Sequence, residues 1–291
     1  PFNTFFMKIN TFSPDKSEYS QVLTTIAKPP KTLDYIGKLP ETRLTSVAIV
    51  GTRRPSTYGK EVTHRLAYDL ASRGIVIVSG LALGVDAIAH KAALEAGGTT
   101  IAVLGNGLPK IQPSSNRGLA DQIVEQGGAI ISEYAHNEDA RPHYFLERNR
   151  LVAGLADAII ITEAATRSGT LNTAAHALEQ GKEIFVVPGN ITSPLSAGCN
   201  ALLKQGARVV TDCRDVLDVI APEAALTQAA LPLGQNELET RLITLIAKGM
   251  RDGEELLARS RVDPTEFATT LTMLELSGTI RALGANQWTL R

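Results

Sequence analysis

Short runs of apolar and β-branched residues recur along the first 220 residues, and most are followed by polar, glycine-containing segments. Such runs predict strands covered on both faces of a sheet. Seven of them lie near residues 46–50, 75–79, 99–104, 128–132, 157–162, 183–187 and 207–211. Between most of them the pattern is helical, as in residues 61–72, where Val62, Leu66 and Leu70 recur every four residues. The alternation predicts an α/β fold with a doubly wound, mainly parallel, Rossmann-like sheet.

Changes in composition divide the chain into four predicted segments. Residues 1–45 are expected to form an irregular arm packed on the main domain, and residues 46–220 to form that domain. Residues 221–236 are rich in Ala, Pro, Leu, Gly and Gln, which is typical of a linker. Residues 237–291 are predicted to form a second domain.

The second domain has the pattern of a small winged helix, with three helices followed by a hairpin. The third helix has the clearest start signal: Asp263 as the cap, Pro264 at the first helical position and Glu266 three residues after the cap. The predicted elements are helices at 241–248, from 252 onward and at 264–276, then a hairpin of residues 279–283 and 287–290.

A winged helix suggests DNA binding, but the charge of the third helix argues against it. Residues 264–276 include Glu266 and Glu275 and no Lys or Arg, whereas contacts to phosphates need basic groups. The pattern favours a structural or protein-binding role. Basic residues flank the helix and keep the DNA-binding alternative open: Arg259, Arg261 and Arg281.

Composition narrows the class of protein. The 291 residues are 44% hydrophobic and 20% charged, as in a soluble globular protein, and no apolar stretch approaches the ~18 residues of a membrane span. Cys199 and Cys213 form neither a disulfide framework nor a zinc spacing, which fits a reducing cytoplasm. The net charge of −1 means that nucleic-acid binding would need a local basic patch.

The most informative segment, residues 156–173, predicts a buried strand, a loop of small residues and a helix. Ser168-Gly169-Thr170 offers hydroxyl and backbone N–H groups where that helix begins, and Arg167 adds a positive charge. Helix N-termini attract anions such as phosphate. The alternative is an ordinary strand-to-helix turn capped by Ser168.

Other predicted strand ends carry similar residues. Gly51-Thr52-Arg53-Arg54-Pro55, Ser79-Gly80 and Pro188-Gly189-Asn190 each follow a strand. Ligands of open parallel sheets bind beyond the carboxyl ends of the strands. These segments therefore predict one concave site for a phosphate-bearing ligand.

Several enzyme signatures are missing from the sequence. There is no Walker loop, no His-Glu-x-x-His pair and no full dinucleotide fingerprint, so we expect no cofactor, no metal and no catalytic residue. Glu163 and Asp86 lie near strand ends; either could take part in catalysis, but orientation of Arg53 or Arg167 is favoured. The five histidines are interpreted as packed or surface residues: His64, His90, His136, His143 and His176.

Taken in order, the motifs resemble the DNA-processing protein A (DprA/Smf) family across residues 19 to 220. The matching strings are Ile49-Val50-Gly51-Thr52-Arg53-Arg54-Pro55 with Tyr58-Gly59, Val78-Ser79-Gly80-Leu81-Ala82-Leu83-Gly84-Val85-Asp86 with Ala89-His90, Ser132-Glu133-Tyr134, Arg148-Asn149-Arg150, Arg167-Ser168-Gly169-Thr170-Leu171, and Val187-Pro188-Gly189-Asn190 with Gly198-Cys199-Asn200. Each string is weak by itself, but the ordered set is specific.

This resemblance implies a homodimeric, non-enzymatic protein that binds single-stranded DNA and delivers RecA onto incoming strands in natural transformation. The family's basic contacts carry over to Arg53 and Arg167, while a further Lys of some members is replaced by Ala165. The predicted DNA-binding set is Gly51, Thr52, Arg53, Ser79, Gly80, Gly84, Arg148, Asn149, Arg150, Arg167, Ser168, Gly169, Thr170, Gly189 and Asn190.

The loop at Ser168-Gly169-Thr170 also resembles that of nucleoside-monophosphate phosphoribohydrolases, which makes a small-nucleotide-binding or nucleotide-hydrolysing protein the alternative. In those enzymes the motif is Pro-Gly-Gly-x-Gly-Thr-x-x-Glu, and Thr173 stands here at the position of the catalytic Glu. The replacement favours binding over hydrolysis.

Overall fold

The computed structural model describes residues 8–222, 236–260, 262–284 and 286–290. The chain separates into two compact units, residues 1–227 and 228–291. The predicted linker, residues 221–236, lies almost entirely outside the described residues. The predicted domain limits therefore stay predictions.

The first unit is built around a nine-stranded sheet that contains all seven predicted strands. They are β3 (Ser46–Val50), β4 (Val76–Ser79), β5 (Thr100–Val103), β6 (Ala129–Ser132), β7 (Ala158–Ile161), β8 (Glu183–Val186) and β9 (Arg208–Val209). These strands pair in parallel in the order β6-β5-β4-β3-β7-β8-β9. The predicted mainly parallel sheet is confirmed.

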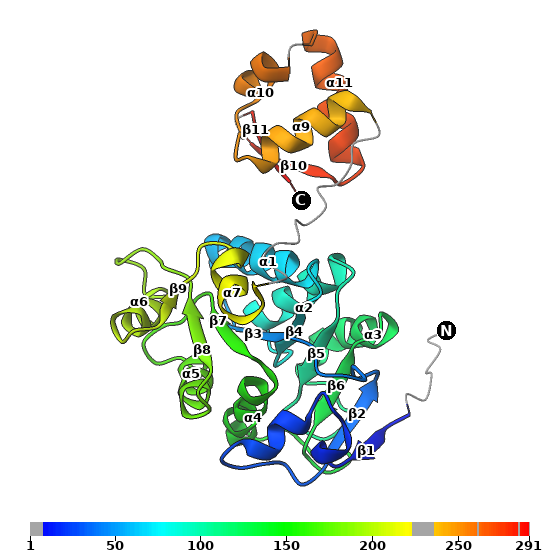
Figure 1. The fold of residues 1–291 in the computed structure, drawn as a ribbon, viewed down its shortest axis with the longest axis vertical. Helices are drawn as coiled ribbons and strands as arrows, with labels where there is room; N and C mark the ends of the chain where they lie inside the picture. The colour runs from blue at the N-terminus through cyan, green and yellow to red at the C-terminus, as the bar shows by residue number, and fades with distance from the viewer. Residues whose placement is uncertain (1–7, 223–235, 261, 285, 291) are drawn as a thin grey trace. The chain divides into compact units, whose positions relative to one another are not determined.

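Helices cover both faces of this sheet, as a doubly wound fold requires. They are α1 (Thr57–Ala71), α2 (Val85–Glu95), α3 (Arg117–Glu125), α4 (Pro142–Leu155), α5 (Thr170–Glu179), α6 (Ala197–Lys204) and α7 (Cys213–Ile220). Alternate side chains of β3 enter two cores: Val47 and Ile49 pack with α1, α2 and α7, and Ala48 and Val50 with α4, α5 and α6. Figure 1 shows α1, α2 and α7 on one side of the sheet and α4 and α5 on the other.

The strand order reverses between β3 and β7. From β3 the chain adds β4, β5 and β6 on one side and then returns to add β7 on the other side of β3. Ligands of open α/β sheets bind at such a switch point, beyond the carboxyl ends of the strands. Here those ends lead into residues 51–54 and 162–169, which the sequence analysis selected.

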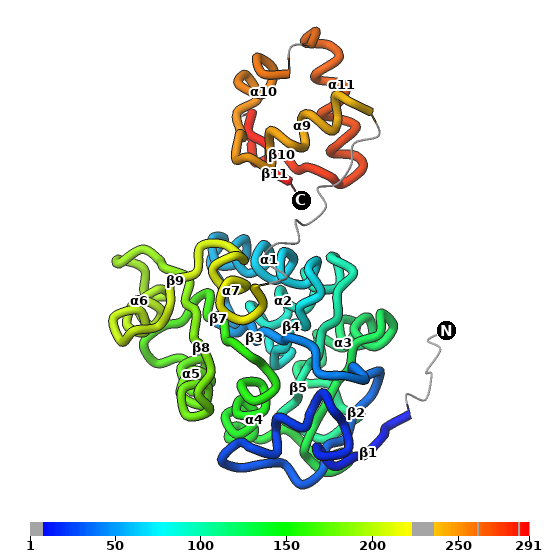
Figure 2. The backbone as a smooth tube through the Cα atoms, in the orientation of Figure 1, coloured from blue at the N-terminus to red at the C-terminus, as the bar shows by residue number. Residues whose placement is uncertain are grey.

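The N-terminal segment differs from the prediction, because it is not irregular throughout. It contains β1 (Asn10–Phe12), β2 (Leu33–Gly37) and the 3-10 turns η1 (Pro14–Lys16) and η2 (Gln21–Thr25). β2 pairs antiparallel with β6, and Figure 2 shows this dark-blue segment running beside α4. In β2 only Leu33 and Ile36 are buried, so the sequence lacks the alternation that marks a strand. The predicted packing of the segment on the main domain is confirmed.

The second unit has the predicted three helices and hairpin. They are α9 (Glu237–Ala247), α10 (Gly253–Ser260), α11 (Pro264–Leu276), β10 (Ile280–Gly284) and β11 (Gln287–Leu290). The Asp263 carboxylate accepts a hydrogen bond from the Thr265 N–H at 2.8 Å, which confirms the predicted cap. α9 starts before the predicted residue 241, because Asn236 caps it through the Glu239 N–H. Leu242, Phe267 and similar side chains form the core of this unit.

None of the helices in the described part of the chain combines the length and apolar character needed to cross a membrane.

Candidate functional site

A hollow of about 230 Å³ lies at the carboxyl ends of the strands around the switch point. It is lined by parts of the loops after β3 and β7 and by one side of α4. Eight residues of the predicted set line it: Gly51, Thr52, Arg53, Arg148, Asn149, Ser168, Gly169 and Thr170. The expectation that separate strand ends contribute to one concave site is met by these two loops.

The loop after β3 is held in place by its backbone. The Thr52 N–H donates to the Glu163 carbonyl at 2.8 Å, and the Thr52 carbonyl accepts from the Val85 N–H at 3.2 Å. Gly84 approaches so closely that a Cβ on it would lie 2.5 Å from the Thr52 carbonyl oxygen, and its φ of +79° also favours glycine. The predicted residue Gly84 therefore shapes the loop from outside the hollow.

Arg53 is the basic group that this loop presents at the hollow. Its side chain is exposed, and its guanidinium carbon lies 5.7 Å from the centre of the Phe145 ring. This cation–π contact directs the charge toward the N-terminal turn of α4. Phe145 was not among the predicted residues; the signal for it in the sequence is an aromatic residue three positions before Arg148.

In the loop after β7, the Ser168 side chain is bonded to the first residue of α5. Its Oγ accepts a hydrogen bond from the Thr170 N–H at 3.2 Å and donates one to Thr170 Oγ1 at 2.9 Å. The N-cap residue of α5 is Gly169 and not Ser168, so the alternative of a helix capped by Ser168 is not what the structure has. Gly169 needs no special backbone, since its φ is −59° and a Cβ would meet only Leu146 at 3.8 Å. Arg167 is exposed and does not line the hollow.

Arg148 lines the hollow from a buried position, which the sequence did not predict. It is 4% exposed, and its Nη1 donates to the carbonyls of Gly80, at 2.7 Å, and Val103. A Cβ on Gly80 would lie 2.5 Å from this guanidinium. Burial lowers the pKa of Arg148, and the nearby Asp86 carboxylate raises it. Arg148 thus fastens the ends of β4 and β5.

Other predicted residues have internal partners and lie outside the hollow. Arg150 forms an ion pair with Glu133 at 2.5 Å, and each side chain is 14% exposed. Ser79 is fully buried and donates to the Ile49 carbonyl at 2.7 Å. Gly189 is enclosed by Ser196 and Asn200, and Asn190 accepts from the Thr192 N–H at 3.0 Å.

The prediction that Glu163 and Asp86 orient Arg53 or Arg167 is wrong, because both buried carboxylates have other partners. Glu163 accepts hydrogen bonds from the Ser56 N–H at 2.8 Å and the Ser56 hydroxyl at 2.6 Å, at the start of α1. Asp86 accepts from the backbone N–H groups of Gly80 at 3.0 Å and Ala82 at 3.4 Å. Burial raises the pKa of Asp86, and Arg148 lowers it. Both carboxylates instead fix loop backbones, because buried N–H groups need acceptors.

Two further residues bear on the chemistry of the site. The His90 ring is fully buried with Nδ1 2.7 Å from Thr100 Oγ1, and burial lowers its pKa to about 3. Its predicted packing role is confirmed. Thr173, at the position of the phosphoribohydrolase Glu, lines the hollow but is only 2% exposed. Among the described residues, no group of three His, Cys, Asp or Glu side chains is arranged to hold a metal ion.

Comparisons with known proteins agree over nearly the whole chain. The family model for DNA recombination-mediator protein A matches residues 10–221, and the DprA winged helix domain matches residues 221–286. Protein Smf of Escherichia coli K12 is 36% identical over 95% of this chain and 76% of its own length. DNA processing protein DprA of Streptococcus pneumoniae R6 is 41% identical over 73% of this chain and 74% of its own length.

Two solved structures share the fold. DNA processing protein A from Streptococcus pneumoniae superposes with a TM-score of 0.69 at 40% identity, covering 74% of this chain and 75% of that one. The protein from Helicobacter pylori, described for its unique single-stranded DNA binding mode, superposes with a TM-score of 0.65 at 34% identity. That match covers 75% of this chain and 97% of the other.

Proposed function

The chain belongs to the DNA recombination-mediator protein A family, and from this premise we propose that it binds the backbone of single-stranded DNA at the switch-point hollow. The observation that carries the proposal is the exposed Arg53 guanidinium, which lies over the Phe145 ring and lines the same hollow as Ser168, Gly169 and Thr170. Positive charge beside hydroxyl and N–H donors is what contacts to phosphate and sugar require.

The conformation of Gly169 supports the proposal that a ligand approaches the backbone of this loop closely. Neither its φ nor the space around its Cβ requires glycine. The backbone at Gly169 lines the hollow without a side chain, so a ligand there can approach it closely. A phosphate at the start of α5 would also meet the positive end of the helix dipole.

The size of the hollow favours a polymer over a whole bound nucleotide. At about 230 Å³ it is smaller than the roughly 300–1,000 Å³ of ordinary small-molecule pockets. The alternative, a small-nucleotide-binding or nucleotide-hydrolysing protein, needs a free carboxylate near the sugar. Thr173 replaces that Glu, and the Asp86 carboxylate is occupied by two backbone N–H groups.

We further propose that the protein is a cytoplasmic, non-enzymatic homodimer that needs no cofactor and loads RecA onto incoming single strands in natural transformation. Family membership supports the recombination-mediating part of this proposal. Arg167, exposed beside the loop, and Asn149, bonded to Asn172 at 3.2 Å, complete the proposed DNA contacts.

The test is a salt titration of single-strand binding by fluorescence anisotropy. The logarithm of affinity should fall by about 0.7 per log unit of salt for each phosphate neutralised. Arg53→Ala with Arg167→Ala should lower affinity at least about 100-fold at low salt and flatten the slope, since each of the two charged hydrogen bonds is worth about 1.5–3 kcal/mol. Arg65→Ala, which removes an exposed charge from α1 outside the hollow, is the control. Equal affinities for folded variants would refute the site.

Loading is tested separately, by RecA filament assembly on single strands already covered by a single-strand binding protein. We expect faster assembly in the presence of this chain, and no base release from nucleoside monophosphates. Absence of acceleration with a cognate RecA, together with nucleotide turnover, would favour the nucleotide-hydrolysing alternative over RecA loading.

A further inference from the structure

Leu81 has a backbone conformation that a bulky side chain disfavours. Its φ is +55°, in the left-handed region, and its side chain is fully buried. Among the described residues, the other non-glycine positions with positive φ are Asn137 and Asn286, and asparagine tolerates this region better. A bulky residue keeps such a conformation only where its surroundings hold it, and residues of this kind cluster at binding sites.

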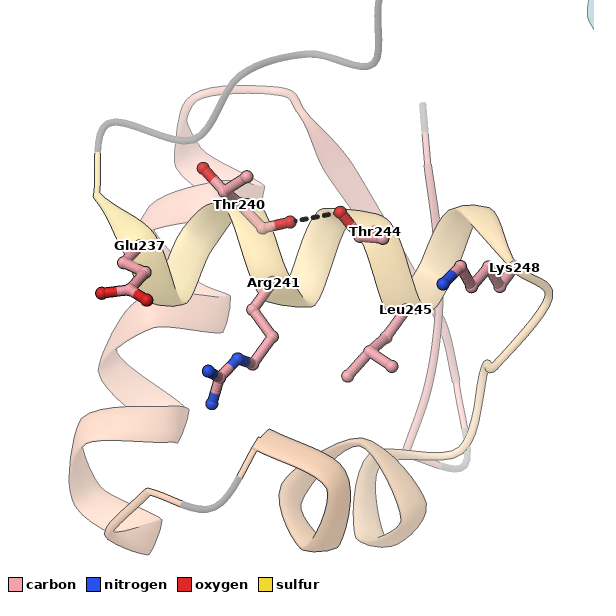
Figure 3. A pocket seen from close by; sticks show the side chains of 6 residues that line it. All are labelled: Glu237, Thr240, Arg241, Thr244, Leu245 and Lys248. Carbon is pink, nitrogen blue, oxygen red and sulfur yellow. Dashed lines mark hydrogen bonds between the residues drawn. The ribbon is translucent and has the colours of Figure 1, made fainter.

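The strained residue belongs to a wall of the switch-point hollow. Ala82, the residue after Leu81, lines that hollow. By contrast, the shallow hollow along α9 in Figure 3 is lined by six residues of this helix and its C-terminal end, none of which has a positive φ. The strain therefore coincides with the proposed DNA-binding site.

Asn116 holds the strained peptide from outside the hollow. Its Nδ2 donates to the carbonyl of Leu81 at 2.9 Å and to that of Ala82 at 3.2 Å, across 35 residues of sequence. Asn116 is 9% exposed and does not line the hollow. Asp86 and Arg148 bond the residue before Leu81, so three side chains from three parts of the chain fix this segment. Because both acceptors of Asn116 are carbonyl oxygens, only a side chain with N–H or O–H donors can satisfy them.

The strained segment in turn braces Arg53. Three residues beyond Leu81, a Cβ on Gly84 would lie 2.5 Å from the Thr52 carbonyl oxygen and 2.6 Å from the Arg53 carbonyl carbon. The next residue, Val85, donates its N–H to the Thr52 carbonyl at 3.2 Å. The two backbones are in direct contact, so a change of direction at Leu81 is transmitted to the residue that carries the exposed guanidinium.

We propose that Asn116 is a positioning residue for single-stranded DNA binding, an inference that rests on the function proposed above for the hollow. Its amide holds Leu81 at positive φ, and this conformation holds Gly84 against the backbone of Arg53. Without the amide, the strain at Leu81 is released by rotation toward negative φ. The Arg53 guanidinium then loses its fixed place over Phe145, and it binds a phosphate less tightly because the side chain must be ordered on binding.

The experiment is a double-mutant cycle between Asn116→Ala and Arg53→Ala in the full chain, measured by fluorescence anisotropy of single-strand binding at low salt. In the wild-type background, Asn116→Ala should lower affinity about fivefold or more, because a preorganised charged contact is lost. In the Arg53→Ala background it should lower affinity by less than about twofold, because the group that it positions is already missing.

The variant Gln180→Ala separates positioning from a general loss of stability. Gln180 Nε2 donates to the Arg150 carbonyl at 3.1 Å, so this variant also removes an amide that bonds a backbone distant in sequence. Gln180 lies at the C-terminal end of α5, roughly 15 Å along the axis from the loop that lines the hollow. Both variants should lower the urea midpoint of unfolding, but only Asn116→Ala should lower affinity. Asn116→Ser keeps a shorter donor and serves if Asn116→Ala does not fold; it should give a smaller loss with the same dependence on Arg53.

The outcomes separate this inference from the function on which it rests. A loss of affinity from Asn116→Ala that disappears in the Arg53→Ala background supports the inference. Unchanged affinity, losses that add in the double variant, or an equal loss from Gln180→Ala overturns it while Arg53→Ala still weakens binding. If Arg53→Ala itself leaves affinity unchanged, the proposed function fails, and the role of Asn116 fails with it.

Discussion

The switch-point hollow and the α11 face are both places where folds of their kind bind ligands, yet they are chemically opposite. The hollow is lined by the exposed Arg53 guanidinium, and hydrogen bonds accepted by Glu163 and Asp86 and donated by Arg148 fix the loops around it. The exposed side of α11 carries no Lys or Arg, and its charged residues are Glu266 and Glu275. The difference teaches that architecture marks a possible site, whereas exposed charge and donors decide what it can bind.

The same lesson applies within α4. Arg148 and Arg150 belong to one basic motif, but Arg148 is buried, Arg150 is only 14% exposed, and both are bonded to groups of the protein. Arg53 belongs to a different loop and is the exposed charge at the rim. A guanidinium that is already satisfied stabilises a site, and only an exposed one can contact a phosphate.

The largest effect should come from removing the support of the hollow. Arg148→Met leaves the Gly80 and Val103 carbonyls without their donor and Asp86 without its nearby positive charge. We expect about 3 kcal/mol lower free energy of unfolding, measured in urea. Arg167→Met, which removes an exposed charge, should change it by less than about 0.5 kcal/mol. Equal stabilities would show that the buried arginine is not a support.

A smaller effect should appear as a pH dependence of stability. Burial lowers the pKa of His90 from 6.5 to about 3, so at intermediate pH the unfolded chain binds a proton that the folded chain does not. Stability from this group is complete above about pH 6.5 and is lost as the pH falls toward 3, by about 1.4 kcal/mol per unit.

The variant His90→Asn isolates this contribution, because an amide N–H can still donate to Thr100 Oγ1. Urea unfolding between about pH 6 and about pH 4 should show a slope reduced by roughly 1.4 kcal/mol per pH unit relative to the wild type. Burial raises the pKa of Asp86, so this group makes stability rise as the pH falls, opposite to His90. Its contribution is the same in the wild type and in the variant. Identical slopes would mean that His90 is protonated in the folded chain.

A matched pair of glycines sharpens the proposal for the hollow. Gly169→Ala meets no clash inside the protein, so stability should be kept while single-strand affinity falls about 5- to 10-fold through contact with the ligand. Gly118→Ala on α3 also enters open space, but away from the hollow, and should leave affinity unchanged. Anisotropy and thermal unfolding of both variants check this. Equal binding would remove Gly169 from the site.

The smallest effect on single-strand affinity is expected from removing the winged-helix unit. Deleting residues 237–291 removes α11, which has no Lys or Arg, and should change single-strand affinity by less than about twofold. Binding of the truncated and full chains to the same oligonucleotide measures it. A large loss in a folded truncation of unchanged oligomeric state would give the winged-helix unit a direct part in DNA binding.

The local pattern of residues along the sequence was sufficient to predict most of the fold. Continuous apolar runs located the seven parallel strands, and Asp263-Pro264 located the start of α11, because burial and capping depend on residues near in sequence. β2 was missed, since only two of its residues are buried and its pairing with β6 is formed across nearly 100 residues. For the site, the two loops were predicted, but Phe145 and the internal partners of Arg148 and Arg150 were not.

The sequence by itself determined most of the secondary structure after residue 45, the glycine-rich strand ends and the lack of basic residues on α11. Only the tertiary structure decided that β3 lies beside β7, that Glu163 caps α1 through Ser56, and that Arg148 is buried while Arg53 is exposed. The physical reason is distance along the chain: Glu163 and Ser56 are 107 residues apart. Their contact exists because strand order brings them together, and local preferences do not contain that order.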